Sequence, residues 1–389
     1  MSDTAVETAV THLSPDARRL LWILTRAQPP VPETLVEKVF ARETVEDERF
    51  RQIGRMMDAF ERMPPEARPE MPVMPDEVKQ RIAALREAGE PERPDLEPLV
   101  GELVEARLVT RAPLLEGGAA MGLEATEAAA IVVAAWMEAR PEERAGQDEA
   151  RVLVAFGERY GAAFIAAVEG KVPGGTKEAG VEAGITAMSY FVGAGAHAAL
   201  AAMFGEAVRA ANDASIVGPV AGAVEEKGGL DALLGAFDAQ NDALGHAGTL
   251  AALAGHHKDA GDLGKAIALE TRALAPLARL DNVVPRAIVH LRVSELLEVA
   301  ARREESAAHL AAAILYRALS GVDFRAEIRA FMVRLGRERG YTLPAAAALL
   351  EDPSFADLAR FVRTNGVPVA DVQADLDALT TQLKQHLGG

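Results

Sequence analysis

Residues 247–280 constrain the fold more than any other stretch, and they read AGTLAALAGHHKDAGDLGKAIALETRALAPLARL. Apolar side chains recur at helical spacing on both sides of Gly261, at Leu250, Leu253, Ala254, Ala266 and Ala273. Small side chains let two antiparallel helices approach closely, and the glycine allows the turn between them. Aromatic residues make up only 5% of the chain, and alanine fills many apolar positions. We therefore predict an all-α protein built from closely packed helix pairs.

This layout resembles a tetratricopeptide repeat, in which helix pairs stack into an α-solenoid. Thr126 is a candidate N-cap, and helical patterns joined by short turns continue from it through residues 126–323. The unit at 247–280 departs from the repeat at Glu270, where the family usually has an aromatic residue. The next unit, 281–314, lacks the glycine of the turn. The resemblance implies a degenerate repeat array that binds other proteins and rarely carries out chemistry.

Residues 1–125 contain a different order of predicted helices and strands. Ser14-Pro15-Asp16 begins a helix as N-cap and first-turn residues. Helices are expected at Pro32–Phe40 and Asp95–Ala106, followed by at most one small β-hairpin, near Leu108–Leu123. The segments LSPDARRLLWILTRAQPPVPETLVEKVF and PDLEPLVGELVEARLVTR resemble the winged helix that follows the nucleotide-binding core in STAND-type signalling ATPases.

A proline-rich segment, 41–94, interrupts this N-terminal module and is interpreted as an insertion. Two amphipathic pieces lie within it, near Glu46–Glu61 and Asp76–Ala88. Residues 62–94 contain seven prolines and little that could be buried, which predicts a mobile backbone. Trypsin-like cleavage is expected after arginines that no proline follows, namely Arg62, Arg81 and Arg86. The alternative is an insertion that is merely tolerated.

No motif in the chain predicts a reaction. A STAND ATPase needs the phosphate loop G-x-x-x-x-G-K-[ST], and the nearest string, Gly174-Gly175-Thr176-Lys177, lacks that glycine spacing. His256 and His257 point about 100° apart on a helix. They and His246 each have only one nearby carboxylate, so we expect no metal site. The chain contains no cysteine and no G-x-S-x-G motif. We expect a protein that is not an enzyme and binds no cofactor.

Charge and hydropathy argue against nucleic acid and membranes as partners. The net charge is −17, and the expected recognition helix, Asp95–Ala106, is rich in acidic residues. Ala183–Gly205 carries no formal charge over 23 residues, which is long enough to span a bilayer. Its alanine and glycine content, with Gly193 and Gly195 placed to break a helix, favours a buried pair of helices. Without a secretory signal or cysteine, the expected location is cytoplasmic.

Together these patterns predict a non-enzymatic adaptor or regulator with a helical cap at residues 324–389. Partner binding is expected on the inner helices of the repeat array, at His256, His257 and Arg292. The STAND resemblance implies bacterial signalling or antiphage defence, with a caspase-like protease or another effector of the same operon as partner. Two alternatives remain open: a transcriptional regulator that places its winged helix on DNA, and a membrane-acting effector that uses the helices at 183–205.

Overall fold

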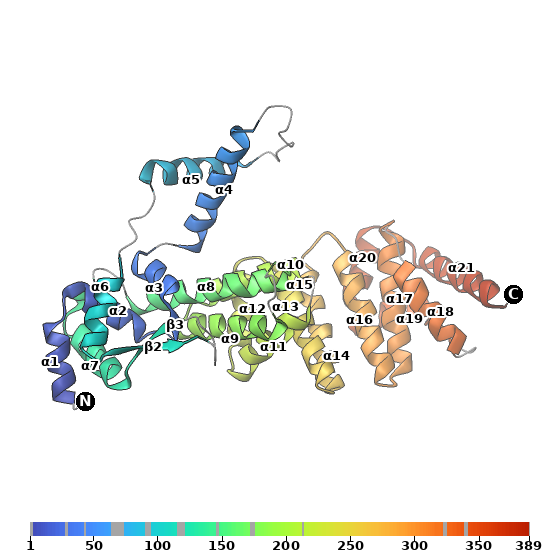
Figure 1. Ribbon diagram of the computed structural model, residues 1–389. Helices are drawn as coiled ribbons and strands as arrows, with labels where there is room; N and C mark the ends of the chain where they lie inside the picture. The colour runs from blue at the N-terminus through green and yellow to red at the C-terminus, as the bar shows by residue number, and fades with distance from the viewer. Residues whose placement is uncertain are drawn as a thin grey trace. The chain divides into compact units, whose positions relative to one another are not determined.

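The protein is described here from a computed structural model (Figure 1). The described residues are 3–27, 30–42, 44–63, 74–89, 95–114, 121–144, 148–171, 176–211, 214–321, 325–337 and 341–388. They are predominantly helical, which confirms the coarse all-α prediction. The chain forms two compact units, unit 1 (Met1–Ala163 and Ala183–Ala199) and unit 2 (Phe164–Glu182 and Leu200–Gly389).

Unit 1 contains a helical core, a small sheet and a helical hairpin. Its elements are α1 (Asp3–His12), α2 (Pro15–Leu24), β1 (Val31–Pro32), α3 (Glu33–Phe40), α4 (Val45–Glu61), α5 (Asp76–Ala88), α6 (Glu97–Glu105), β2 (Val109–Pro113), β3 (Met121–Ala125), α7 (Glu127–Glu138), η2 (Pro141–Arg144), and parts of α8 (Glu149–Val168), α9 (Lys177–Gly193) and α10 (His197–Ala210). Ser14 caps α2 by accepting from the Ala17 N–H, as its sequence predicts. Glu102 of α6 in turn accepts from the backbone N–H and the hydroxyl of Ser14, at 2.6 and 2.7 Å. This contact joins α6 to the start of α2.

The sheet of unit 1 has three antiparallel strands in the order β1-β3-β2. Val31 pairs with Leu123, and Val109 pairs with Ala125. The prediction of at most one hairpin is therefore wrong by one strand. Two residues are too few to show the alternating pattern of a strand, and β1 forms only because β3 offers a free edge to it.

The two amphipathic pieces of the proline-rich segment form α4 and α5, which pack against each other (Figure 1). Ile82 is 3% exposed and packs beside Gly54. A Cβ added to Gly54 would lie 3.1 Å from the Ile82 side chain. Ile82 is the single buried residue in the described part of 62–94, which agrees with the expectation that this stretch holds little that can be buried. Residues 64–73 and 90–94 lie outside the described residues.

Unit 2 is built from helices that pack in sequence order. Its elements after the shared α8, α9 and α10 are α11 (Ala214–Glu226), α12 (Leu230–Ala239), α13 (Ala243–Asp259), α14 (Leu263–Arg272), α15 (Leu274–Leu277), α16 (Val284–Val299), α17 (Arg303–Leu319), α18 (Arg325–Arg337), α19 (Ala346–Glu351), η3 (Pro353–Phe355), α20 (Ala356–Thr364) and α21 (Val369–Gly388). α13 packs against α11 and α14, and α16 packs against α14 and α17 (Figure 1). The uncharged stretch Ala183–Gly205 is split between α9 and α10, with Gly195 at φ 65° in the break. None of the described helices is long and apolar enough to cross a membrane.

The turns between paired helices share one conformation. Gly261 adopts a φ of 86°, and the N–H of Asp262 donates to the carbonyl of His257 at 2.9 Å. This is the hydrogen-bond pattern of a helix that ends in a left-handed residue. Asn241 and Ala301 occupy the same position in two further turns, at φ 55° and 59°. The unit that lacks the glycine therefore keeps the turn and places alanine in a conformation that favours glycine.

Replacing Ala301 with glycine is expected to stabilise the protein by about 1 kcal/mol, because a left-handed φ costs an alanine about that much. Gly261→Ala should destabilise by a similar amount for the same reason. The neighbouring variant Ala300→Gly is the control, since Ala300 has a φ of −78° and gains nothing from glycine. Urea unfolding measures all three. An Ala301→Gly variant no more stable than the parent would contradict the prediction.

Candidate functional site

The floor of a groove in unit 2 is made by small residues of α13. The groove has a volume of about 500 Å³ and is bounded by α10, α11, α13, α14 and α16. The small residues on α13 are Gly248, Ala251, Ala252 and Gly255. A volume of this size, lined mostly by apolar groups with a few polar ones, is typical of a binding site.

The two glycines of this floor have different roles. A Cβ on Gly248 would lie 2.0 Å from the side chain of Val208, so this glycine allows α10 and α13 to pack closely. A Cβ on Gly255 would meet no described atom within 4 Å, so this glycine leaves open space above the helix. Glycine inside a helix costs about 1 kcal/mol relative to alanine. Gly255 therefore enlarges the groove without allowing any closer helix packing.

One buried carboxylate belongs to the groove lining. Glu270 of α14 is 2% exposed, and its Oε1 has no hydrogen-bond partner among the described residues. Its nearest described cation is Arg292 of α16, whose Nη1 lies 3.6 Å from Oε1. That distance permits an ion pair but exceeds a hydrogen bond. Burial raises the pKa of the Glu270 carboxyl, and the nearby Arg292 only partly offsets this effect.

Further charged groups line the groove beside Glu270. Lys258 of α13 and Glu295 of α16 are exposed, and the side chain of Arg292 is 53% exposed. Two carboxylates and two cations thus share one apolar groove, and only Glu270 is removed from water. A charge is expensive to bury without hydrogen bonds. Glu270 is therefore the group in this groove whose electrostatic energy a bound molecule would change most.

The sequence prediction placed partner binding at His256, His257 and Arg292, and the structure separates these residues. Arg292 lines the groove. The histidines are half-buried, facing α11, where His257 Nε2 lies 2.8 Å from Glu225 Oε2. His256 packs over Gly222, where an added Cβ would lie 2.8 Å from its ring. The two histidines thus take part in a helix–helix contact, and a role in partner binding stays a prediction for His256, His257 and Arg292 alike.

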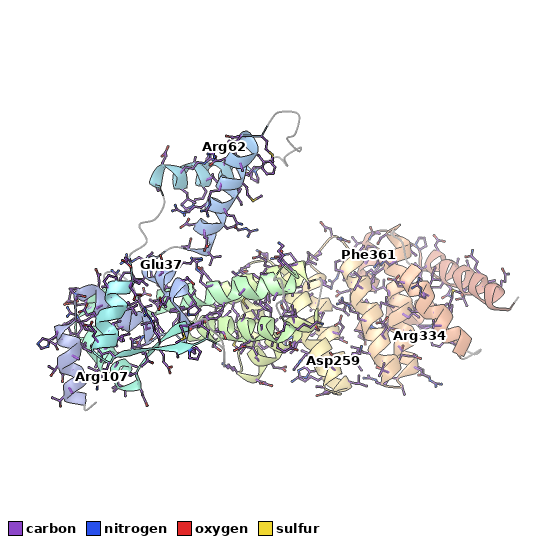
Figure 2. All side chains as sticks on the ribbon, in the orientation of Figure 1. Glu37, Arg62, Arg107, Asp259, Arg334 and Phe361 are labelled. Atoms are coloured by element: carbon purple, nitrogen blue, oxygen red, sulfur yellow. The ribbon has the colours of Figure 1, made fainter. Side chains whose placement is uncertain are left out.

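The three arginines expected to be protease-sensitive lie at the α4–α5 hairpin. Arg62 directly follows the last residue of α4 (Figure 2). Arg81 and Arg86 belong to α5, where Arg81 pairs with Asp47 at 2.6 Å and Arg86 pairs with Asp58. A helix held by ion pairs must open locally before a protease can cut it. Cleavage after Arg62, Arg81 or Arg86 stays a prediction, and at Arg81 and Arg86 it would require α5 to open locally.

Sequence reasoning missed this groove, although two signals were present. By its resemblance to a tetratricopeptide repeat, the sequence has Glu270 where such a repeat usually has an aromatic side chain, and a charge at that position indicates a special environment. Gly248 and Gly255 are seven residues apart, which places them on one face of α13. Neither signal reveals which helix faces this surface.

Comparisons with known proteins add no identification. No protein-family model matches the chain, and neither a curated protein nor a solved structure is significantly similar to it. Within the described residues, no group of three or more His, Asp or Glu side chains is arranged to hold a metal ion. The case for a function therefore rests on the groove.

Replacing Glu270 with glutamine is expected to stabilise the protein at pH 7 by about 1 kcal/mol, a typical cost of a buried group without its hydrogen bond. Burial raises the pKa of this carboxyl in the folded state. As the pH rises, the unfolded chain therefore loses the proton first, and stability falls until the pH passes the folded-state pKa. Glutamine keeps the shape and stays neutral, so this loss disappears.

Thermal unfolding of the two proteins between pH 4 and pH 8 measures the effect. Glu295→Gln is the matched control, because Glu295 lines the same groove but is exposed. It should change the unfolding free energy by less than about 0.5 kcal/mol. A clear loss of stability in Glu270→Gln would mean that the ion pair with Arg292 holds the fold together, contrary to this prediction.

Proposed function

We propose that this chain is a non-enzymatic adaptor or regulator that binds a segment of another protein in the groove of unit 2. The observation that carries the proposal is Glu270, a buried carboxylate that belongs to the lining of the groove and whose Oε1 has no hydrogen-bond partner among the described residues. Residues that lower stability without a structural benefit are commonly kept for function. The open space at Gly255 points in the same direction.

The fold of unit 2 suits this function. Its paired helices, which share one left-handed turn, support the part that lies in unit 2 of a degenerate TPR-like solenoid proposed over residues 126–323, with residues 324–389 as a helical cap. Repeat arrays of this kind bind extended partner segments along their helices. The groove is lined chiefly by α13 and α16, the first helices of two such pairs. A partner segment in the groove would contact both.

The N-terminal residues 1–125 suit a winged-helix-like module that contacts protein and not DNA. The order α2-β1-α3-α6-β2-β3, with the sheet order β1-β3-β2, supports such a module, and α4 and α5 form an insertion within it. In α6, Glu102 accepts from Ser14, and Glu97 pairs with Arg111 at 2.6 Å. Arg111 also pairs with Glu33 at 3.0 Å. A surface whose arginine is already paired twice with carboxylates is poorly suited to DNA phosphates, which weighs against a transcriptional regulator.

The biological setting follows from the sequence resemblance alone. We propose a cytoplasmic role in bacterial signalling or antiphage defence, in which the partner is a caspase-like protease or another effector of the same operon. The groove is compatible with such a partner because it could bind a short segment of any protein whose side chains match its apolar and charged lining.

Capture of partners from native lysate by the tagged full-length chain tests the proposal. The variant Gly255→Leu fills the groove, since the added side chain enters open space. Gly235→Leu is the matched control: Gly235 is exposed on α12, away from the groove, and also has open space above it. We expect specific partners to be lost in Gly255→Leu and kept in Gly235→Leu, with similar melting temperatures. Identical capture by both variants would contradict the proposal.

A further inference from the structure

We propose that the groove binds a basic side chain, lysine or arginine, of the partner segment, and that this side chain pairs with Glu270. The inference rests on the proposed protein-binding function and names the chemistry of the partner. The geometry that carries it is a buried carboxylate oxygen without a hydrogen-bond donor, in a groove large enough to admit one.

Glu270 is an acceptor without a donor. Its Oε1 is buried and makes no hydrogen bond to any described group. Leaving a buried charged acceptor unpaired is costly, while a hydrogen bond between oppositely charged groups away from water is among the strongest that proteins form. An entering ammonium or guanidinium group would supply the missing donor. Glu270 thus gains more from a cation than from any neutral or anionic occupant.

Arg292 does not already fill this role. Its Nη1 is 3.6 Å from Oε1, and its side chain is 53% exposed. Attraction between such groups is weakened by water and by the freedom of the exposed side chain. Arg292 can therefore move aside for a second cation without breaking a hydrogen bond to Oε1.

The walls of the groove fit the stem of a long basic side chain. Val208, Leu296 and Val299 line the groove, and Val299 is 64% exposed. Lysine and arginine commonly lay their methylene groups on apolar surfaces while the charged end finds a polar partner. A single large apolar side chain would cover these walls but would leave Glu270 unpaired.

Charge outside the groove favours the same class of partner. The chain carries a net charge of −17, which attracts cationic segments and repels anionic ones. An anionic occupant could pair with Lys258 and Arg292, which both line the groove. It would also bring a second negative charge towards Glu270 and take Arg292 away from it. The cationic occupant is therefore favoured.

The test is selection of a random phage-displayed peptide library on the immobilised full-length chain. We expect the selected peptides to share a lysine or arginine. Synthetic copies should bind at least about tenfold more weakly to Glu270→Gln, a loss of about 1.4 kcal/mol. Changing the shared arginine to citrulline, which is neutral and nearly the same shape, should cause the same loss. Glu304→Gln is the control and should keep affinity within about twofold, because Glu304 is exposed on α17 outside the groove and an exposed charge contributes little.

The outcomes separate this inference from the proposed function. If the selected peptides were acidic or uncharged and Gly255→Leu no longer bound them, the groove would remain the binding site, but the inference that it binds a basic side chain would be overturned. Basic peptides bound equally by Glu270→Gln would do the same. Selected peptides that bind equally well to Gly255→Leu would overturn both. A folding defect is separated from a binding defect by the melting temperature, which should rise in Glu270→Gln.

Discussion

Replacing Arg317 with methionine will lower the stability of the region around α17 and α18 by about 3–5 kcal/mol, the usual cost of removing one member of a buried ion pair. Arg317 Nε lies 3.2 Å from Glu327 Oε1, and the Glu327 side chain is only 1% exposed. Neither Glu327 carboxylate oxygen has a hydrogen-bond partner among the described residues. Without Arg317, this carboxylate would remain buried and lose its ion pair.

Hydrogen exchange of the backbone amides in α17 and α18 measures this loss as a free energy of local opening. The second variant carries Glu327→Leu together with Arg317→Met, and its stability should return to within about 1 kcal/mol of the parent, since an apolar pair replaces a buried ionic one at little cost. Arg329→Met changes an exposed arginine on α18 and is the control. If the double variant were as unstable as Arg317→Met, packing and not the unpaired carboxylate would explain the loss.

Lowering the pH from 7 to 4 will destabilise the contact between α16 and α17 through a pair of histidines, of which His290 is buried and His309 is half-buried. His290 Nδ1 lies 2.9 Å from His309 Nδ1, so one ring donates and the other accepts. His290 is 3% exposed, and its ring stacks on Tyr316 and Phe355 with centroid distances of 5.7 and 5.6 Å. Protonating the accepting nitrogen would break this hydrogen bond and place a charge among aromatic rings.

Burial lowers the pKa of His309 to about 4 and holds the pKa of His290 well below its ordinary value. Glu305 and Asp352 favour the charged form of His309, whereas Arg302 opposes it. Because the unfolded chain takes up protons near pH 6.5 and the folded protein does not, the stability present above that pH is lost as the pH falls towards 4. For His309 alone, the loss is about 3 kcal/mol, at 1.36 kcal/mol per pKa unit.

Hydrogen exchange of α16 and α17, corrected for the intrinsic effect of pH on exchange, measures this loss. The variant His309→Asn keeps a polar group near the Nδ1 position but cannot be protonated in this range. Between pH 7 and pH 4 it should therefore lose about 3 kcal/mol less stability than the parent. His12→Asn changes an exposed histidine of α1 and should retain the parent's pH dependence at α16 and α17. Parallel pH profiles for His309→Asn and the parent would contradict the prediction.

The features that the sequence predicted correctly depend on nearby residues. Ser14 and Thr126 cap helices in the structure as expected, each accepting from an N–H three residues later. The turn at Gly261 separates α13 from α14 at the predicted position. Caps, turns and helical periodicity act within a few residues. They can therefore be derived from the order of amino acids without knowledge of the rest of the fold.

The features that the sequence did not predict depend on which faces meet. β1 forms because Val31 finds the free edge of β3, far along the chain. His256 and His257 contact α11, because the rotation of α13 is set by its packing at Gly248 and Gly222. Glu270 became a candidate binding residue only when α14 and α16 enclosed it beside Arg292. The sequence by itself determined the helices and their ends through local interactions. Only the tertiary structure decided the groove, because burial and charge at each position depend on side chains contributed by several helices.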